Sequence, residues 1–265
     1  MSIAPIGQLL LAKYTPPGAA VLILWDHCLT LDEEVAAMWG SFGGKILTKV
    51  VYIMNRYFTE VVMLYTAYVF TGLGGTRTNK DCTNVLWLLV ISSIVLASIS
   101  QFFIMMRAYR LWDHKPTVRR ILPVVFVACT IGTLVLAVLT VLTLLRTRIE
   151  LVPPKVMVCV VSGVPKTIPS ALGILLLFNL LVILVSIYSA LENPRRYEGE
   201  IFDSLRRDGA RMYLVILWVL LLITSLVAEI SVFFPVFMLT SALMVNLTSR
   251  MHLCIESLSN ITREG

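Results

Sequence analysis

Apolar residues gather along the chain into seven long stretches, separated by short polar segments. The stretches cover residues 6–27, 46–70, 85–106, 121–145, 168–191, 212–228 and 232–249. A helix needs about 20 apolar residues to cross the hydrocarbon core of a bilayer, at about 1.5 Å per residue. The pattern therefore predicts an all-α polytopic membrane protein, with a seven-span membrane domain at 1–251 and a short tail at 252–265.

The sequence allows two different starting points for the first helix. Pro16 and Pro17 lie inside it, and prolines in a helix interior remove backbone donors and clash with the preceding turn. Either a kinked helix begins near Ile6, or a shorter helix begins near Pro17 and ends near Asp26. Residues 1–12 have no basic region and no small-residue cleavage pattern, so we expect no cleaved signal peptide and insertion directed by the first span itself.

The last two stretches are predicted by dividing one longer apolar run. Residues 212–245 contain a single charge, Glu229. One helix over this run would be about 51 Å long, whereas the hydrocarbon core is about 30 Å thick. We therefore predict two helices joined by a tight turn at 229–235. We also place Pro123 and Pro169 in the first turns of the fourth and fifth helices, where proline is tolerated.

A polar segment at 26–39 follows the first stretch. Thr30 and Glu33 have the spacing of a capping box, and Asp32 and Glu34 add negative charge at a helix start. This favours a short helix on the cytoplasmic membrane surface, with Trp39 at the depth of the lipid headgroups. The alternative is an ordinary polar loop.

Composition and charge support the membrane class and give an orientation. Hydrophobic residues make up 58% of the chain and charged residues 14%, against about 25% in soluble proteins. With the N-terminus outside, cytoplasmic segments hold 14 Lys and Arg and outside segments hold 7. Positive residues favour the cytoplasmic side, so we predict N-outside and C-cytoplasmic. The net charge of +6 thus reflects topology and lipid contact, and does not indicate nucleic-acid binding.

Two of the five cysteines fall on the outer side in this topology. Cys82 lies at the outer end of the third span, and Cys159 lies in the loop after the fourth. A disulfide between them is chemically permitted there, and two unpaired thiols are the alternative. We interpret Cys28 and Cys129 as small apolar fillers.

Polar side chains inside the spans form the next group of candidates. Arg56 and Glu60 are one helical turn apart, next to Asn55. Charges in a span face the bundle interior or a partner, so these residues form either a ligand, proton or ion site or a structural clamp. In the clamp, Arg56 pairs with Glu60 and Asn55 bonds to a neighbouring helix. Asn179 and Asn246 are predicted helix–helix donors, and Glu229 is a further intramembrane polar residue.

The sequence Leu-Trp-Asp-His occurs twice, at 24–27 and 111–114. With His252, this puts all three histidines at the predicted cytoplasmic face. Histidines and carboxylates gathered there could hold a metal that activates water. The alternative is a set of interfacial tryptophans with polar partners. The candidate residues at this boundary are Asp26, His27, Thr30, Asp32, Glu33, Glu34, Trp39, Arg107, Tyr109, Trp112 and Arg250.

Several of these motifs resemble a known family. Residues 25–35 with Trp39, 55–57, 107–112 and, more weakly, 247–250 are similar to fungal, basidiomycete-type multi-span membrane proteins defined by a domain of unknown function. Members usually have no double proline before the Asp-His pair and a small residue in place of Arg110. The resemblance covers essentially the whole chain. It implies the multi-span fold and leaves the activity open.

The first functional hypothesis is a receptor-like protein without enzymatic activity or cofactor, in the plasma membrane or a secretory-pathway membrane. It would bind a small ligand among its helices and present 107–120 and 192–211 to a cytosolic signalling partner, with membrane lipids around it. Its layout is similar to that of seven-helix G-protein-coupled receptors, which is an analogy of architecture only. The alternatives are a proton-coupled carrier using Arg56, Glu60 and Glu229, and a metal-dependent intramembrane hydrolase.

Overall fold

The computed structural model describes residues 6–39, 46–71, 79–111, 116–146, 150–151, 159–160, 165–192, 201–228 and 230–264. These residues form seven α-helices, which confirms the predicted all-helical class. The helices are α1 (Ile6–Glu34), α2 (Ile46–Thr71), α3 (Asn79–Leu111), α4 (Pro116–Arg146), α5 (Thr167–Glu192), α6 (Ile201–Val227) and α7 (Ile230–Glu264). A π-helical turn, η1 (Val35–Trp39), directly continues α1. The strands β1 (Glu150–Leu151) and β2 (Cys159–Val160) form one short antiparallel pair.

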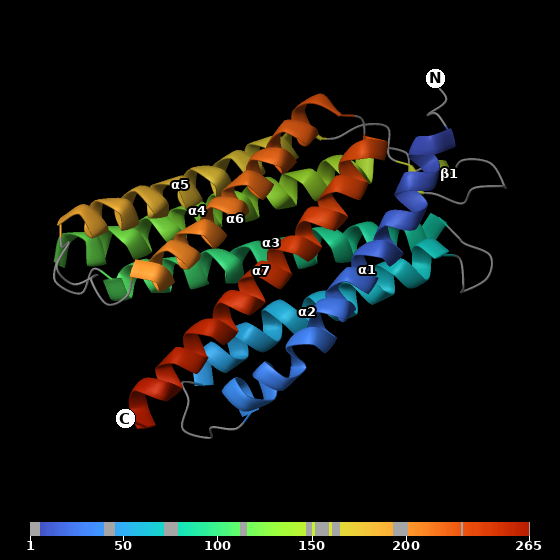
Figure 1. The fold of residues 1–265 in the computed structure, drawn as a ribbon. Coiled ribbons are helices and arrows are strands. Elements are labelled where there is room, and N and C mark those ends of the chain that lie inside the picture. The colour runs from blue at the N-terminus through green and yellow to red at the C-terminus, as the bar shows by residue number, and fades with distance from the viewer. Residues whose placement is uncertain are drawn as a thin grey trace.

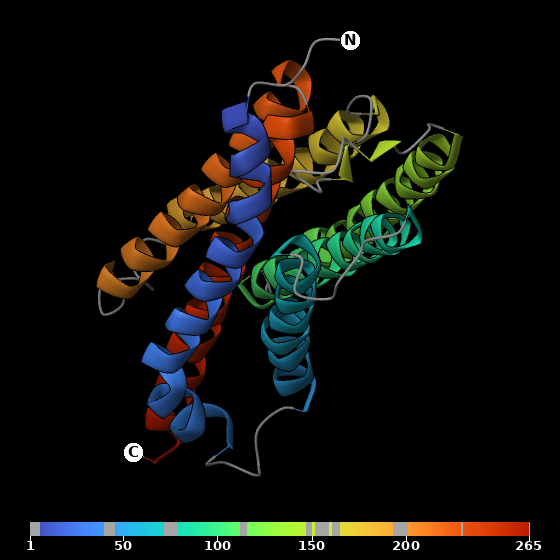
Figure 2. The ribbon, with the colours of Figure 1, turned by 90° about the vertical axis from the view of Figure 1, so that its right-hand side faces the viewer.

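The helix α7 joins two groups of helices into one bundle. It contacts α1, α2 and α6, while α3, α4 and α5 pack together, α5 also contacts α6, and α3 also contacts α2. Figures 1 and 2 show α7 beside α1, with the N-terminus at one end of the bundle and the C-terminus at the other. The end of α1, the start of α2 and the end of α7 therefore meet at the C-terminal end of the bundle.

Among the described residues, four helices are long and apolar enough to cross a membrane. The qualifying segments are Trp87–Met106 in α3, Arg120–Thr143 in α4, Thr167–Val185 in α5 and Val232–Cys254 in α7. The apolar part of α6 is shorter, at Tyr213–Val227. Charged side chains such as Asp26, Arg56 and Glu60 lower the hydropathy of α1 and α2.

The helix α4 exposes an apolar surface. Large hydrophobic side chains project outward from turn after turn, and a soluble monomer rarely exposes a continuous patch of that kind. Lipid is the surrounding in which such a surface is stable, so the exposed face agrees with a membrane setting. The exposed residues are Ile121, Val124, Val127, Ile131, Leu134, Val135, Val138, Leu139 and Leu142.

The first helix begins at Ile6 and continues through both prolines. Of the two starts left open by the sequence, the structure has the earlier one. Just after the prolines, the small side chains of Ala19 and Ala20 are buried in a core shared with Met238 and Ala242 of α7, so α1 and α7 approach closely there.

The separate interfacial helix predicted after the first span is wrong. No helix begins at Thr30, because α1 runs on to Glu34 and η1 follows it. The Thr30 hydroxyl donates to the carbonyl of Asp26, one turn earlier in α1, at 2.9 Å and does not cap a helix start. The capping-box pattern was misleading because buried partners on other helices hold this segment in the α1 helix.

Three further boundaries differ from the predictions. Pro116 is the first residue of α4, so Pro123 lies two turns inside the helix, whereas Pro169 does lie in the first turn of α5. Pro235 is inside α7, since that helix begins at Ile230, so the connection to α6 is shorter than predicted. The segment assigned to the tail, 252–264, continues α7 as helix.

Candidate functional site

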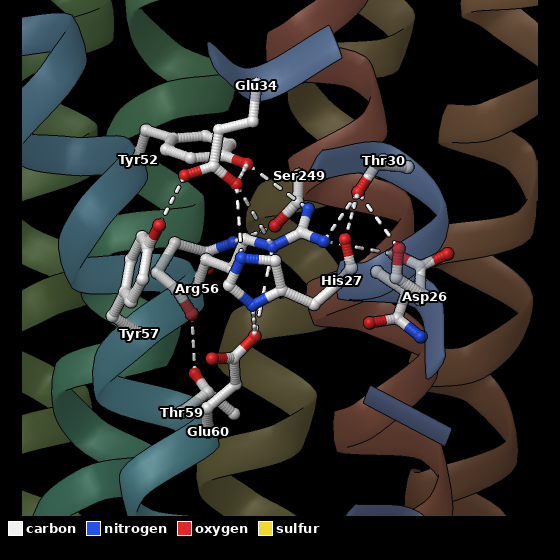
Figure 3. A network of polar contacts seen from close by, with 12 residues as sticks. Asp26, His27, Thr30, Glu34, Tyr52, Arg56, Tyr57, Thr59, Glu60 and Ser249 are labelled. Carbon is white, nitrogen blue, oxygen red and sulfur yellow. Dashed lines mark hydrogen bonds and ion pairs between the residues drawn. The ribbon is translucent and has the colours of Figure 1, made fainter. Parts of the chain in front are cut away.

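A buried arginine stands at the centre of a polar cluster at the C-terminal end of the bundle. The side chain of Arg56, from α2, is only 2% exposed. Its Nη2 donates to the hydroxyl of Thr30 on α1 at 2.6 Å, and its Nη1 donates to the hydroxyl of Tyr52 at 3.2 Å. Figure 3 shows these groups converging on the guanidinium.

Three carboxylates surround this guanidinium at ion-pair distance. The Arg56 Nε lies 3.7 Å from Glu34 Oε2 and 3.8 Å from Glu60 Oε1. Its Nη2 lies 3.8 Å from Asp26 Oδ2. Burying one charge is costly unless it is paired, so the arginine and the three acids stabilise one another in place.

Glu34 is the main hydrogen-bond acceptor of the cluster and is 0% exposed. The hydroxyl of Tyr52 donates to its Oε2 at 2.8 Å, and the hydroxyl of Tyr57 donates to its Oε1 at 2.5 Å. The indole of Trp39 donates to the same Oε1 at 3.3 Å. Trp39 is five residues after Glu34, so the π-helical turn η1 places the indole one wide turn away from the carboxylate.

A histidine bridges two of the acids. The His27 Nδ1 lies 2.5 Å from Glu60 Oε1, and its Nε2 lies 3.5 Å from Glu34 Oε2. The ring of Tyr57 packs edge-on against the imidazole, with 5.2 Å between the centroids. The imidazole therefore ties α1 to α2 beside the arginine.

The helix α7 closes the cluster from a third side. The Arg250 Nε donates to Asp26 Oδ1 at 2.8 Å, and the Asn55 amide donates to the Ser249 hydroxyl at 3.4 Å. The His252 ring stands edge-on to Tyr52, at 6.0 Å between centroids. We call the following residues the Arg56 cluster: Asp26, His27, Thr30, Glu34, Tyr52, Asn55, Arg56, Tyr57, Glu60, Ser249 and Arg250.

Helical periodicity places these side chains on one face of each helix. On α1, Asp26, Thr30 and Glu34 are spaced by four, and four residues make about one turn. On α2, Tyr52, Asn55, Arg56, Thr59 and Glu60 follow the same 3.6-residue repeat. Two polar stripes therefore face each other between the helices, although each helix carries apolar residues on its outer side.

In the structure, two groups of candidate residues that were predicted at different sites lie in one cluster. Figure 3 shows Asp26, His27, Thr30 and Glu34, which were predicted at the membrane surface, beside Arg56 and Glu60, which were predicted inside a span. Asn55, also predicted inside a span, bonds to Ser249 next to them. Sequence reasoning missed Tyr52, Tyr57 and Ser249 as members of the site. The four-residue spacing from Tyr52 to Arg56 was the signal that could have identified the tyrosine.

The remaining candidates have different positions. Asp32 and Glu33 are exposed on α1, outside the cluster. Glu229 and Trp112 lie outside the described residues. The backbones of Arg107, Tyr109 and Cys82 belong to α3 and that of Cys159 to β2, but their side chains are outside the described part. The predicted Cys82–Cys159 disulfide therefore stays a prediction.

The contacts that the clamp requires are present, and they are equally compatible with a ligand, proton or ion site. Arg56 faces Glu60, and Asn55 bonds across to α7. Asn246 also bonds between helices, to the carbonyl of Leu22 at 3.4 Å.

Two smaller predictions need correction. The amide of Asn179 donates at 2.8 Å to the Leu175 carbonyl of its own helix, and Gln101 of α3 supplies the interhelical bond to that same carbonyl. The polar group that links α3 to α5 is therefore the glutamine. Cys28 is exposed and does not fill a gap in the core, whereas Cys129 packs beside the core of α3, α4 and α5.

The chemistry available in this cluster is charge compensation and proton exchange. Two atoms of it, Arg56 Nε and Asp26 Oδ2, are buried without a hydrogen-bond partner among the described residues. Within that same part of the chain, no group of three or more His, Cys, Asp and Glu side chains could hold a metal ion. The metal-hydrolase alternative has no supporting geometry there.

Together, the fold and the cluster define an all-helical protein whose apolar helices are compatible with an integral membrane protein. Residues 14–59 match a protein family described as a family of unknown function (DUF6533). This segment supplies α1 from Tyr14 onward and the first half of α2, and therefore most of the Arg56 cluster. Comparison with curated proteins and with solved structures found no match.

Proposed function

We propose that the chain crosses the membrane seven times, with its N-terminus outside and its C-terminus in the cytosol. The helices α1, α2 and α6 have 29, 26 and 27 residues, which exceeds the length needed for a span. Four of the charges that lower the hydropathy of α1 and α2 are buried in the Arg56 cluster: Asp26, Glu34, Arg56 and Glu60. Asp32 and Glu33 are exposed at the end of α1, and apolar side chains such as Val21, Trp25, Val61 and Leu64 are exposed along the two helices.

Epitope accessibility tests this topology. With one tag at each end of the chain, we expect the N-terminal tag to bind antibody on intact cells and the C-terminal tag to bind only after permeabilisation. The basic residues on the cytoplasmic side are the physical reason, because positive loops resist translocation. Labelling of the C-terminal tag on intact cells would refute the orientation.

For its role, we propose a receptor-like protein of the plasma membrane or secretory pathway, without enzymatic activity of its own. One observation carries this proposal: a continuous polar connection runs from the surface to the core at the end we assign to the cytosol. Arg250 of α7 is 54% exposed and bonds to the buried Asp26 of α1, which faces Arg56 of α2. A partner that draws Arg250 away would change how the three helices are held together.

This coupling predicts a gain of activity when the connection is broken. Asp26→Asn removes the charge that holds Arg250, so we expect the cytosolic end of α7 to separate more readily from α1. The measurement is nucleotide exchange by a purified heterotrimeric G protein, added to the protein in nanodiscs. We expect Asp26→Asn to raise the basal exchange rate several-fold.

The matched control is Asp32→Asn, the same chemical change at an exposed position of the same helix. It should leave the exchange rate at the wild-type value, and Arg250→Gln should reproduce the effect of Asp26→Asn from the other side of the contact. If folded wild-type protein and both contact variants all fail to stimulate exchange, the G-protein-coupled form of the proposal is rejected.

A proton-coupled carrier is the second candidate. The observation in its favour is the 2.5 Å contact between His27 and Glu60 inside a cluster of charges. Ionisable groups buried among membrane helices commonly act in proton relays. A solute-driven proton flux into vesicles, lost in Glu60→Gln and retained in Glu33→Gln, would favour the carrier over the receptor.

A further inference from the structure

The imidazole of His27 faces a carboxylate with each of its two nitrogens. Its Nδ1 is 2.5 Å from Glu60 Oε1 on α2, and its Nε2 is 3.5 Å from Glu34 Oε2 on α1. A neutral imidazole has one N–H donor and one lone pair, whereas the protonated ring has two donors. With both acids ionised, a neutral ring would therefore direct one lone pair at a carboxylate.

The other two acids of the cluster accept hydrogen bonds from groups other than His27, Glu34 through both of its oxygens and Asp26 through Oδ1. Glu34 accepts hydrogen bonds from Tyr52, Tyr57 and Trp39. Asp26 accepts a charge-assisted bond from Arg250 at 2.8 Å. Glu60 has its short contact with His27, and Arg56 is farther away, at 3.8 Å. An additional proton therefore fits best between His27 and Glu60.

The net charge of the cluster also favours one additional proton at His27 and Glu60. Three carboxylates, Asp26, Glu34 and Glu60, face two guanidinium groups, Arg56 and Arg250, so these five groups together with a neutral His27 carry a net charge of −1. One added proton brings the sum to zero. A buried net charge is costly in a medium of low dielectric constant, and the neutral cluster avoids that cost.

The groups around this pair come from three helices. The titratable and charged side chains are Asp26 and Glu34 of α1, Tyr52, Arg56 and Tyr57 of α2, and Arg250 and His252 of α7. The His27 side chain is 16% exposed, which gives a proton a route to the pair from the surface.

We propose that His27 and Glu60 form a proton-binding site that holds one exchangeable proton per chain. The bound proton neutralises the Arg56 cluster and holds α1 against α2. Its release leaves an uncompensated carboxylate between the two helices, which weakens their contact. This proposal depends only on the contacts within the Arg56 cluster. It holds for a receptor and for a carrier alike.

Two spectroscopic measurements on the full chain in nanodiscs, near neutral pH, test this. ¹⁵N NMR of histidine-labelled protein distinguishes a doubly protonated ring from a neutral one. Infrared spectroscopy detects the C=O stretch of a protonated carboxyl group. We expect one of two results. Either the wild type shows one imidazolium signal that His27→Gln removes, or it shows one carboxylic-acid band that Glu60→Gln removes. In either case the variant binds one proton per chain fewer than the wild type.

The control is Glu33→Gln, which changes an exposed acid of α1 and should leave both spectra as in the wild type. If His27→Gln does not fold, the histidine signal can be assigned by elimination with His114→Gln and His252→Gln, because the chain has three histidines. A neutral His27 together with the absence of a band assignable to Glu60 would overturn the proposal. That result would leave the G-protein and solute-flux tests unaffected.

Discussion

Replacing Arg56 by glutamine is expected to destabilise the protein by about 3–5 kcal/mol, the usual cost of removing one partner from a buried ion pair. The variant leaves Asp26, Glu34 and Glu60 facing one another without the central positive charge. It also removes the donors to Thr30 and Tyr52. The measurement is thermal or denaturant unfolding of the purified protein in detergent.

Arg56→Lys separates the effect of charge from the effect of geometry. Lysine keeps the positive charge but lacks the planar fork that reaches several acceptors at once, so we expect an intermediate loss of stability. Arg120→Gln is the control, because Arg120 is exposed at the start of the α4 span and should change stability by less than about 0.5 kcal/mol. Unfolding of Arg56→Gln at the wild-type midpoint would show that the cluster does not stabilise the fold.

The second large effect is expected at the bond between Glu34 and Tyr52. The hydroxyl of Tyr52 donates to Glu34 and accepts from Arg56, and both Tyr52 and Glu34 are 0% exposed. Loss of one partner from a buried hydrogen bond costs about 1–3 kcal/mol. We therefore expect Tyr52→Phe and Glu34→Gln each to destabilise the protein by about that amount.

A double-mutant cycle measures how far the two residues act together. Because they share one network, the double variant should lose less stability than the two single losses combined, by about 0.5–3 kcal/mol. Tyr65→Phe is the matched control, since Tyr65 is 43% exposed on the same helix. Simple additivity of the two effects would contradict the shared network.

Much of the helical layout can be predicted from the sequence. Helix α2 begins at Ile46 and ends one residue after the predicted boundary, and Pro169 lies in the first turn of α5, as proline preferences suggest. These boundaries depend on local composition, which the chain carries within a few residues. The extent of α1 could not be read in this way, because helix-breaking prolines and a capping pattern suggested interruptions that packing against α2 and α7 overrides.

The site, like the helix boundaries, was predictable only where its residues are close together in the sequence. Arg56 and Glu60 could be paired from sequence, because four residues along a helix bring two side chains together. The capping pattern at Thr30 separated Asp26 and His27 from that pair. Ser249 and Arg250 are more than 190 positions away from Arg56, and no local pattern places them beside it.

By itself, the sequence determined that this is an all-helical protein with apolar helices suited to a membrane, because a backbone without access to water must form its hydrogen bonds within each helix. The tertiary structure decided which polar residues meet. Stripes from α1 and α2, closed by the end of α7, surround one buried arginine. That meeting depends on contacts between distant segments, since a buried charge is stable only where several helices together supply its partners.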